Sequence, residues 1–366
     1  MENEMKILFV ISTLENCGPV NVLYALCAKL AHNQRISVLT ISAEKNDSRW
    51  DDFSALPIEL ESLNLTRSQF MLYGCRRLKT FLTGKHFDVT HSHGIRADRL
   101  VSKLASSQNN TVKFSTAHNF PFEDYVSTYG KILGSLMANL QFRYWKKISN
   151  VITCSQYIGR QIKEKETSVH VTNVHNGTLQ GQFICTKQLN SETINLIVLG
   201  SLNERKNSQF ILECMQRVEP QLKRLKLTLV GNGPLFAELK KKYTSQQIIF
   251  KGHVKEPSSL LNDADWLLSA SKSEGLPMAV LEALSWNCNL LLSDIGPHIE
   301  INEVVNNCDI CRVFTLTQAR DLEQLLLGID QGIITWHEGG YELWQRNFSA
   351  SVMAKKYLRT YQAKQN

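Results

Sequence analysis

The sequence contains no apolar run of the roughly 18 to 20 residues that a membrane-spanning helix needs. A basic region and a cleavage site are both missing from the strand-like start, Met1 to Val10, so we expect no secretory signal peptide. The 9 cysteines show no framework spacing, and a zinc site of about four ligands would need a second pair beside Cys308 and Cys311. We therefore expect ordinary free thiols in a reducing compartment, and a cytoplasmic protein.

Two ligand-binding signatures are also missing. No Gly-x-Gly-x-x-Gly follows the first predicted strand, which argues against a dinucleotide-dependent oxidoreductase. No Asp-x-Asp stands at the end of a predicted strand, and the neighbouring carboxylates Asp51-Asp52 and Glu123-Asp124 lack that context. We therefore expect no cofactor and no required metal.

Acidic residues are scarce in one part of the chain. Residues 66–165 contain 16 Lys and Arg against 5 Asp and Glu, whereas residues 179–366 are close to balanced, with 20 against 19. Such an asymmetry predicts that the first half meets an anionic surface or substrate. Because no nucleic-acid-binding motif accompanies the charge, an anionic membrane or a lipid phosphate is the better candidate, and we expect no nucleic acid.

Short, continuous apolar runs alternate with helical segments, a pattern typical of parallel sheets with helices on both faces. A polar stretch near 178–192 interrupts it, so we expect two Rossmann-like α/β domains, 1–178 and 193–347, and a terminal helix at 348–366. Ligands of such sheets lie at the carboxyl ends of the strands, so the two domains should face a cleft there. The predicted strands are 6–12, 36–41, 87–91, 112–116, 150–155, 194–199, 225–230, 248–250, 266–269 and 289–293.

The sharpest motif is Ser273-Glu-Gly-Leu-Pro-Met-Ala-Val-Leu-Glu282. Seven residues separate Glu274 from Glu282, Gly275 permits close approach of the backbone, and Pro277 suits the first position of a helix. The start of a helix has free N–H groups and a positive dipole end, which together form an anion site. Two helical turns would separate the glutamates by about 12 Å, a span comparable to a sugar diphosphate. The alternative is a pair of solvated glutamates on a helix.

This segment resembles the donor-binding motif of family 4 retaining glycosyltransferases, in which seven residues separate two glutamates, and Gly and Pro follow the first. The resemblance implies that Glu274 is catalytic. It also implies donor contacts from the rest of the motif: Gly275, Leu276, Pro277, Met278 and Glu282.

Two further loops resemble that family. Residues 200–207 are similar to the loop in which an Arg and a Lys contact the donor diphosphate, and Lys206 falls on the Lys position. Ser201 stands where the family has its Arg, and the neighbouring Arg205 is a candidate substitute. Gly231 lies in a segment resembling the next loop, whose glycines let the chain pass close to the nucleotide.

The first half resembles the family less closely. His118 falls on the histidine that reaches the donor sugar, which makes it the second catalytic candidate. His91 and His93 stand at another strand end, where a lone histidine is more often a satisfied polar group. Gly18 lies in the first strand-end loop, where the family brings backbone close to the donor phosphates, although the family pattern is richer in glycine there.

The resemblance covers nearly the whole chain and is strongest over 195–300. It implies the GT-B fold, with an acceptor-binding first domain, a donor-binding second domain and a terminal helix that crosses back to the first. The implied activity is a retaining, metal-independent hexosyltransfer from a UDP- or GDP-hexose to a glycan or polyprenyl-linked acceptor in bacterial O-antigen or capsule synthesis. Two alternatives stay open: a GT-B sugar-nucleotide epimerase, and a non-catalytic nucleotide-sugar-binding protein.

The stretch from Tyr129 to Lys147 is mostly apolar and has a basic end. One interpretation is a helix packed within the first domain. The other is a face that rests on an anionic bilayer, which would make the protein peripheral to the inner face of the cytoplasmic membrane.

Overall fold

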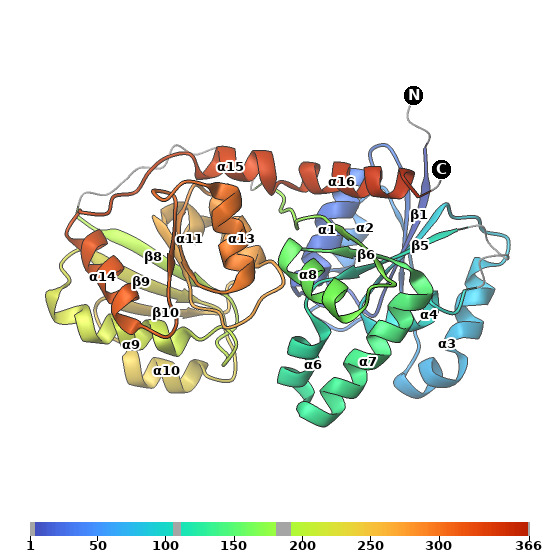
Figure 1. Cartoon of the computed structure of the whole chain (residues 1–366), viewed down its shortest axis with the longest axis horizontal. Coiled ribbons are helices and arrows are strands. Elements are labelled where there is room, and N and C mark those ends of the chain that lie inside the picture. The colour runs from blue at the N-terminus through green and yellow to red at the C-terminus, as the bar shows by residue number, and fades with distance from the viewer. Residues whose placement is uncertain (1–3, 105–110, 181–191, 365–366) are drawn as a thin grey trace. The chain divides into compact units, whose positions relative to one another are not determined.

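The computed structural model describes residues 4–104, 111–180 and 192–364, and the chain divides into two compact units (Figure 1). Unit 1 comprises Met1–Gly177 together with Ala350–Asn366, and unit 2 comprises Thr178–Ser349. Most of the stretch predicted to link two domains, 178–192, lies outside the described residues.

Unit 1 is built on a seven-stranded parallel sheet with the order β3-β2-β1-β4-β5-β6-β7. Five of the six residues of β1 and every residue of β4 are buried, because helices cover both faces of the sheet. The strands are β1 (Lys6–Ile11), β2 (Arg35–Thr40), β3 (Glu59–Ser62), β4 (Val89–His93), β5 (Val112–Ala117), β6 (Asn150–Thr153) and β7 (His170–Asn173).

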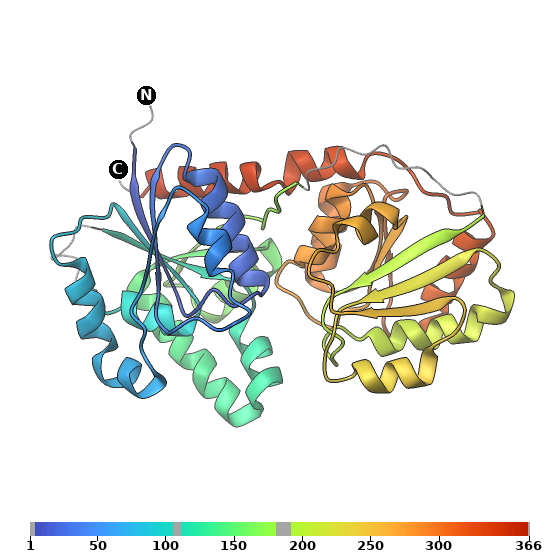
Figure 2. The ribbon, with the colours of Figure 1, turned by 180° about the vertical axis from the view of Figure 1, so that it is seen from behind.

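Helices cover both faces of this sheet (Figures 1 and 2). They are α1 (Gly18–Leu30), α2 (Trp50–Ser54), α3 (Arg67–Leu82), α4 (Ile95–Val101), α6 (Pro121–Tyr129), α7 (Lys131–Ile148), α8 (Gln156–Lys165) and α16 (Ala350–Gln362).

The last helix, α16, belongs to unit 1 although all of unit 2 precedes it in the chain. It packs against α1, and it buries Met353, Tyr357 and Tyr361 almost completely. Gly177 also donates its N–H to the Met353 sulfur, at 3.1 Å. The final helix is therefore part of the core of unit 1.

Unit 2 repeats the architecture with a six-stranded parallel sheet in the order β10-β9-β8-β11-β12-β13. Its strands are β8 (Ile194–Leu199), β9 (Leu225–Val230), β10 (Ile248–Gly252), β11 (Trp266–Ser269), β12 (Asn289–Ser293) and β13 (Cys311–Phe314). Its helices are α9 (Ser208–Val218), α10 (Phe236–Tyr243), α11 (Ser258–Asp263), α12 (Met278–Ser285), α13 (Gly296–Val305), α14 (Ala319–Asp330) and α15 (Gly340–Asn347), with a 3-10 turn, η1 (Glu219–Gln221).

The two parallel sheets confirm the predicted α/β architecture. In each sheet the strand order reverses beside the first strand, between β1 and β4 in unit 1 and between β8 and β11 in unit 2. Such reversal points leave a crevice at the carboxyl ends of the strands, which is where open α/β sheets bind ligands. Among the described residues, no helix is long and apolar enough to cross a membrane.

Candidate active site

In unit 2, a small pocket lies where the strand order reverses. The ends of β8 and β11 form its walls, and the loop after β8 contributes Gly200, Ser201 and Lys206. Ser208, the first residue of α9, also lines it. The pocket thus combines the end of a parallel sheet, the start of a helix and a lysine, which are the elements that bind a phosphate group.

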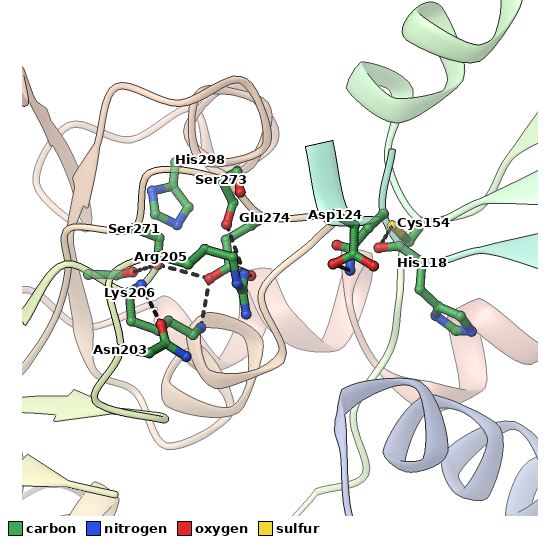
Figure 3. A network of polar contacts seen from close by, with 12 residues as sticks. His118, Asp124, Cys154, Asn203, Arg205, Lys206, Ser271, Ser273, Glu274 and His298 are labelled. Atoms are coloured by element: carbon green, nitrogen blue, oxygen red, sulfur yellow. Dashed lines mark hydrogen bonds and ion pairs between the residues drawn. The ribbon is translucent and has the colours of Figure 1, made fainter. Parts of the chain in front are cut away.

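The Glu274 carboxylate lies between two cations (Figure 3). One oxygen is 2.7 Å from Lys206 Nζ, and the other is 2.7 Å from Arg205 Nη1. Ser271 Oγ donates a hydrogen bond of 2.8 Å to the first oxygen. Burial alone would raise the pKa of Glu274, but Lys206 and Arg205 together lower it to about 2. Glu274 is therefore ionised at neutral pH.

The loop between β8 and α9 brings the two cations to this carboxylate. Asn203 Oδ1 accepts the backbone N–H of Lys206 at 2.9 Å, and Arg205 Nη1 also donates to the Ser273 carbonyl at 2.9 Å. Ser201, at the position where the family has an arginine, is exposed. The Arg205 guanidinium therefore stands beside Lys206 on the same carboxylate.

Gly231 serves the packing of two neighbouring loops. Its backbone has a φ of +139°, and a Cβ there would overlap the carbonyl oxygen of Gly200. Gly200 in turn has a φ of +142° and lies under the Lys206 side chain. Gly231 thus lets the loop that contains Lys206 approach its own loop. Its expected approach to the nucleotide stays a prediction.

The start of α12 differs from the prediction. Pro277 precedes the helix, with an extended ψ of 114°, and Met278 is the first helical residue. Pro277 is the N-cap residue of the helix. Only its carbonyl takes part in the helical hydrogen bonds, and it accepts the N–H of Val280 at 3.1 Å. Glu274 consequently lies in the loop before α12, so the expected separation of two helical turns from Glu282 is wrong.

The remaining residues of the motif surround this helix start. Gly275, Leu276 and Pro277 are buried, and Met278 is half-buried. Glu282 lies in the second turn of α12 and is also half-buried.

Sequence reasoning missed two buried side chains of unit 2. Ser208 is 1% exposed, and its hydroxyl has no hydrogen-bond partner among the described residues. His298, from α13, binds Ser293 Oγ through Nδ1 at 3.0 Å, and its Nε2 is buried without a partner in the described structure. Burial lowers the pKa of His298 to about 4, against an opposing effect of the nearby Glu274. Residues 291–300, which include His298, resemble a further cleft loop of the family, but no role was predicted for either side chain, because tertiary packing brings both to the site.

In unit 1, three histidines lie close together: His91 and His93 on β4, and His118 directly after β5. His118 follows β5 and is half-buried, and its Nε2 is 3.0 Å from Nδ1 of His93, the last residue of β4. Cys154 Sγ donates to the His118 carbonyl at 3.3 Å (Figure 3). His93 thus fixes the orientation of the His118 ring, a role the sequence did not indicate.

His91 belongs to the core. Its Nδ1 is 2.7 Å from the Tyr361 hydroxyl, and its Nε2 is 2.8 Å from Thr116 Oγ1. Burial lowers the pKa of His91 to about 3 and of His118 to about 4, and it brings the pKa of His93 well below the usual value. All three rings are neutral at pH 7.

Gly18 is the first residue of α1 and is exposed. No atom lies within 4 Å of the position its Cβ would take, and its φ is not positive. Neither packing nor backbone conformation therefore demands a glycine here. Its expected contact with a donor phosphate stays a prediction.

Comparison with known proteins finds similarity to glycosyltransferases. Residues 193–329 match the family model described as glycosyl transferases group 1. An O-antigen biosynthesis glycosyltransferase of Escherichia coli, WclY, is 23% identical over 370 residues, which cover 98% of each chain. A capsular polysaccharide biosynthesis glycosyltransferase of Staphylococcus aureus, CapH, is 24% identical over 272 residues, which cover 69% of this chain and 71% of CapH.

Solved structures show the same fold. Anabaena Alr3699/HepE, crystallised in complex with UDP, superposes with a TM-score of 0.75 at 14% identity, covering 98% of this chain and 100% of the other. TarM superposes with a TM-score of 0.78 at 11% identity, covering 98% and 99%. The chain has an α/β GT-B fold, and its similarities support a glycosyltransferase whose second unit carries a glycosyl transferases group 1 domain.

Proposed function

We propose that the protein is a retaining, metal-independent hexosyltransferase of family 4 type. It moves a sugar from a UDP- or GDP-hexose to a glycan or lipid-linked acceptor in the synthesis of a surface polysaccharide. One observation carries the proposal above all: the ionised Glu274 lies between Lys206 and Arg205, at 2.7 Å from each, beside a pocket at the strand ends.

The charges of this cluster suit a nucleoside diphosphate. Two cations against one carboxylate leave one positive charge without a partner in the cluster. A diphosphate that enters competes with Glu274 for Lys206 and Arg205, and the Ser208 hydroxyl offers a further donor. Glu274, once released, accepts hydrogen bonds from the hydroxyls of the donor sugar. Side chains thereby stabilise the leaving diphosphate, in place of a divalent cation.

The chemistry follows from this arrangement. The bond between the anomeric carbon and the diphosphate oxygen breaks while the acceptor oxygen bonds to the same face of the sugar. The acceptor's proton passes to the departing phosphate oxygen. Lys206 and Arg205 stabilise the charge that develops on the diphosphate, and His118, neutral at pH 7, contacts the donor sugar as the resemblance implies.

The relatives support the assignment of substrates. WclY is named for O-antigen biosynthesis and CapH for capsular polysaccharide biosynthesis, which favours a surface glycan as acceptor. Alr3699/HepE was crystallised with UDP and with UDP-glucose, which favours a uridine nucleotide as donor.

The test begins with a thermal-shift screen of UDP- and GDP-hexoses. A ligand present at about 100 times its dissociation constant should add about 2.7 kcal/mol of stability. The donor found in this way is then incubated with and without an oligosaccharide or polyprenyl-linked acceptor, and proton NMR follows the anomeric signal. An α-linked donor should yield an α-glycoside only when the acceptor is present.

Each other result rejects part of the proposal. A β-glycoside would show inversion and remove the roles given to Glu274 and His118. Conversion of the donor without an acceptor, to its epimer, would identify an epimerase. Donor binding without any turnover would identify a binding protein.

A further inference from the structure

Exposed apolar side chains of the described residues gather in two segments of unit 1. Seven of the ten large apolar side chains that are exposed lie there, with Leu72 at 74% and Ile132 at 90%. We call these segments together the docking surface. It consists of Met71, Leu72 and Tyr73 in α3 and of Tyr129, Ile132, Leu133 and Leu136 at the junction of α6 and α7.

The helices that carry this surface are well packed, so the exposure does not reflect a frayed end. Gly134 lets α7 approach α6 so closely that a Cβ would overlap the backbone of Tyr125. Trp145 of α7 donates to the buried Asp98 of α4 at 3.1 Å. On the other side, Arg99 of α4 donates to the Met71 carbonyl at 3.2 Å.

Two of the three helices that carry this surface, α3 and α7, contain eight basic residues and no acidic residue, whereas the first turn of α6 contains Glu123 and Asp124. Lys146 forms an ion pair with Glu166 at 2.6 Å. Exposed apolar side chains alone could pack against any apolar partner. Apolar side chains on the same helices as basic residues favour a partner with an apolar interior and an anionic surface. The basic residues are Arg67, Arg76, Arg77 and Lys79 in α3, and Lys131, Arg143, Lys146 and Lys147 in α7.

Both segments lie toward the carboxyl edge of the sheet of unit 1. The helix α3 follows the end of β3, and α6 follows the end of β5, where His118 stands. Figures 1 and 2 show α3 and the α6–α7 pair projecting from the same side of the unit. A partner that contacts both segments therefore lies along the carboxyl edge of the sheet, the edge at which His93 and His118 stand.

We propose that this surface docks the protein onto an anionic lipid bilayer. The apolar side chains enter the boundary between headgroups and acyl chains, and the cations pair with lipid phosphates. A second copy of the chain is a poorer occupant, because a symmetric dimer through this surface would bring two sets of like charges together. The proposal goes beyond glycosyl transfer and does not depend on it.

The test is co-sedimentation of the whole protein with vesicles. One set contains equal parts of phosphatidylglycerol and phosphatidylcholine, and the other contains phosphatidylcholine alone. Binding should need phosphatidylglycerol and should weaken as salt rises, since screening shortens the range of the attraction. Equal binding to both sets, or no binding to either, overturns the proposal.

Two double variants locate the contact. Leu72→Ser with Ile132→Ser should lower the partition coefficient by at least tenfold. Arg76→Gln with Arg77→Gln should lower it by roughly 25-fold, about fivefold for each cation near the surface. Ile333→Ser in unit 2 is the matched apolar control, because Ile333 is 76% exposed.

Lys240→Gln with Lys241→Gln in α10 is the matched control for charge, because both lysines are exposed. Both controls should bind vesicles as the wild type does, and a control that loses as much binding as its counterpart overturns the proposal.

Two further measurements separate the outcomes. Sedimentation velocity without vesicles should give the same species for the wild type and for Leu72→Ser with Ile132→Ser. A wild-type dimer that the variant dissolves would make the surface an interface between copies and would overturn the proposal. Glu274→Gln should still bind vesicles, and the Leu72 and Ile132 variant should still bind UDP, so failure of this proposal is distinguishable from failure of the proposed activity.

Discussion

Replacement of Glu274 by Gln keeps the size of the side chain and removes its charge. We expect transfer to fall by about 100-fold or more, the scale on which loss of a charge-stabilising group acts. We expect UDP to bind as well as before or about tenfold more tightly, because Lys206 and Arg205 lose the carboxylate that competes with the diphosphate. Opposite effects on binding and on turnover are the signature of this arrangement.

The pKa of Glu274 sets the effect on stability. Its decrease from 4.5 to about 2 corresponds to about 3 kcal/mol of favourable interaction for the ionised form. Arg205 is about a third exposed, so solvent screening reduces the working value to about 2 kcal/mol. Because the folded pKa is the lower one, this stability is present above pH 4.5 and is lost as the pH falls toward 2.

Three assays test the Glu274 prediction: titration calorimetry with UDP, the transfer rate, and urea unfolding near neutral pH and near about pH 3. The wild type should lose more than half of its advantage in stability over the variant at the acidic pH. Glu323→Gln, which removes an ion pair of 2.8 Å with Arg217 in the same unit, should leave UDP binding and transfer unchanged. UDP affinity that falls together with transfer in the Glu274 variant would refute the competition between carboxylate and diphosphate.

Four more predictions follow from the two sites. Arg205→Ala should weaken UDP binding about tenfold, and adding Ser201→Arg should restore it in calorimetry; no restoration would show that an arginine at position 201, although it lines the pocket, does not replace Arg205 on the diphosphate. Ser208→Ala should weaken UDP binding without lowering the melting temperature, because its buried hydroxyl has no partner to lose among the described residues; unchanged affinity would contradict this. His93→Gln should lower kcat more than it raises the donor KM, and transfer by the wild type should show no step near pH 6.5, because His118 has a pKa of about 4 and is charged only below it. Transfer should persist in EDTA, and loss restored by manganese would contradict the role of the two cations.

The sequence predicted the interior strands of both sheets and one edge strand, β10, and missed the other three edge strands. The strands β3, β7 and β13 were not predicted, and each lies at an edge of its sheet. Interior strands are buried on both faces and read as continuous apolar runs, whereas β3 is Glu-Leu-Glu-Ser, with alternate residues exposed. An edge strand has one neighbour and much solvent, so its composition resembles that of a loop.

In the candidate site, the sequence likewise indicated some residues and missed others. Glu274 and Lys206 stand out in sequence because they belong to local motifs, and the structure brings them together across 68 residues of chain. Ser208 and His298 do not stand out, because only tertiary packing removes their polar atoms from water. His93 lies beside His118 because β4 and β5 pair in register, which no local pattern encodes.

The membership of α16 in unit 1 has a consequence for the order of events at the ribosome. Domains generally fold as units during synthesis, with the amino-terminal one first. Here Tyr357 and Tyr361, which close the polar layer around His91, are translated only after every residue of unit 2. The part of unit 1 that is synthesised first therefore leaves the surface that α16 covers exposed until unit 2 has been synthesised. A premature stop codon shortly before α16 would destabilise unit 1, although most of that unit was made first.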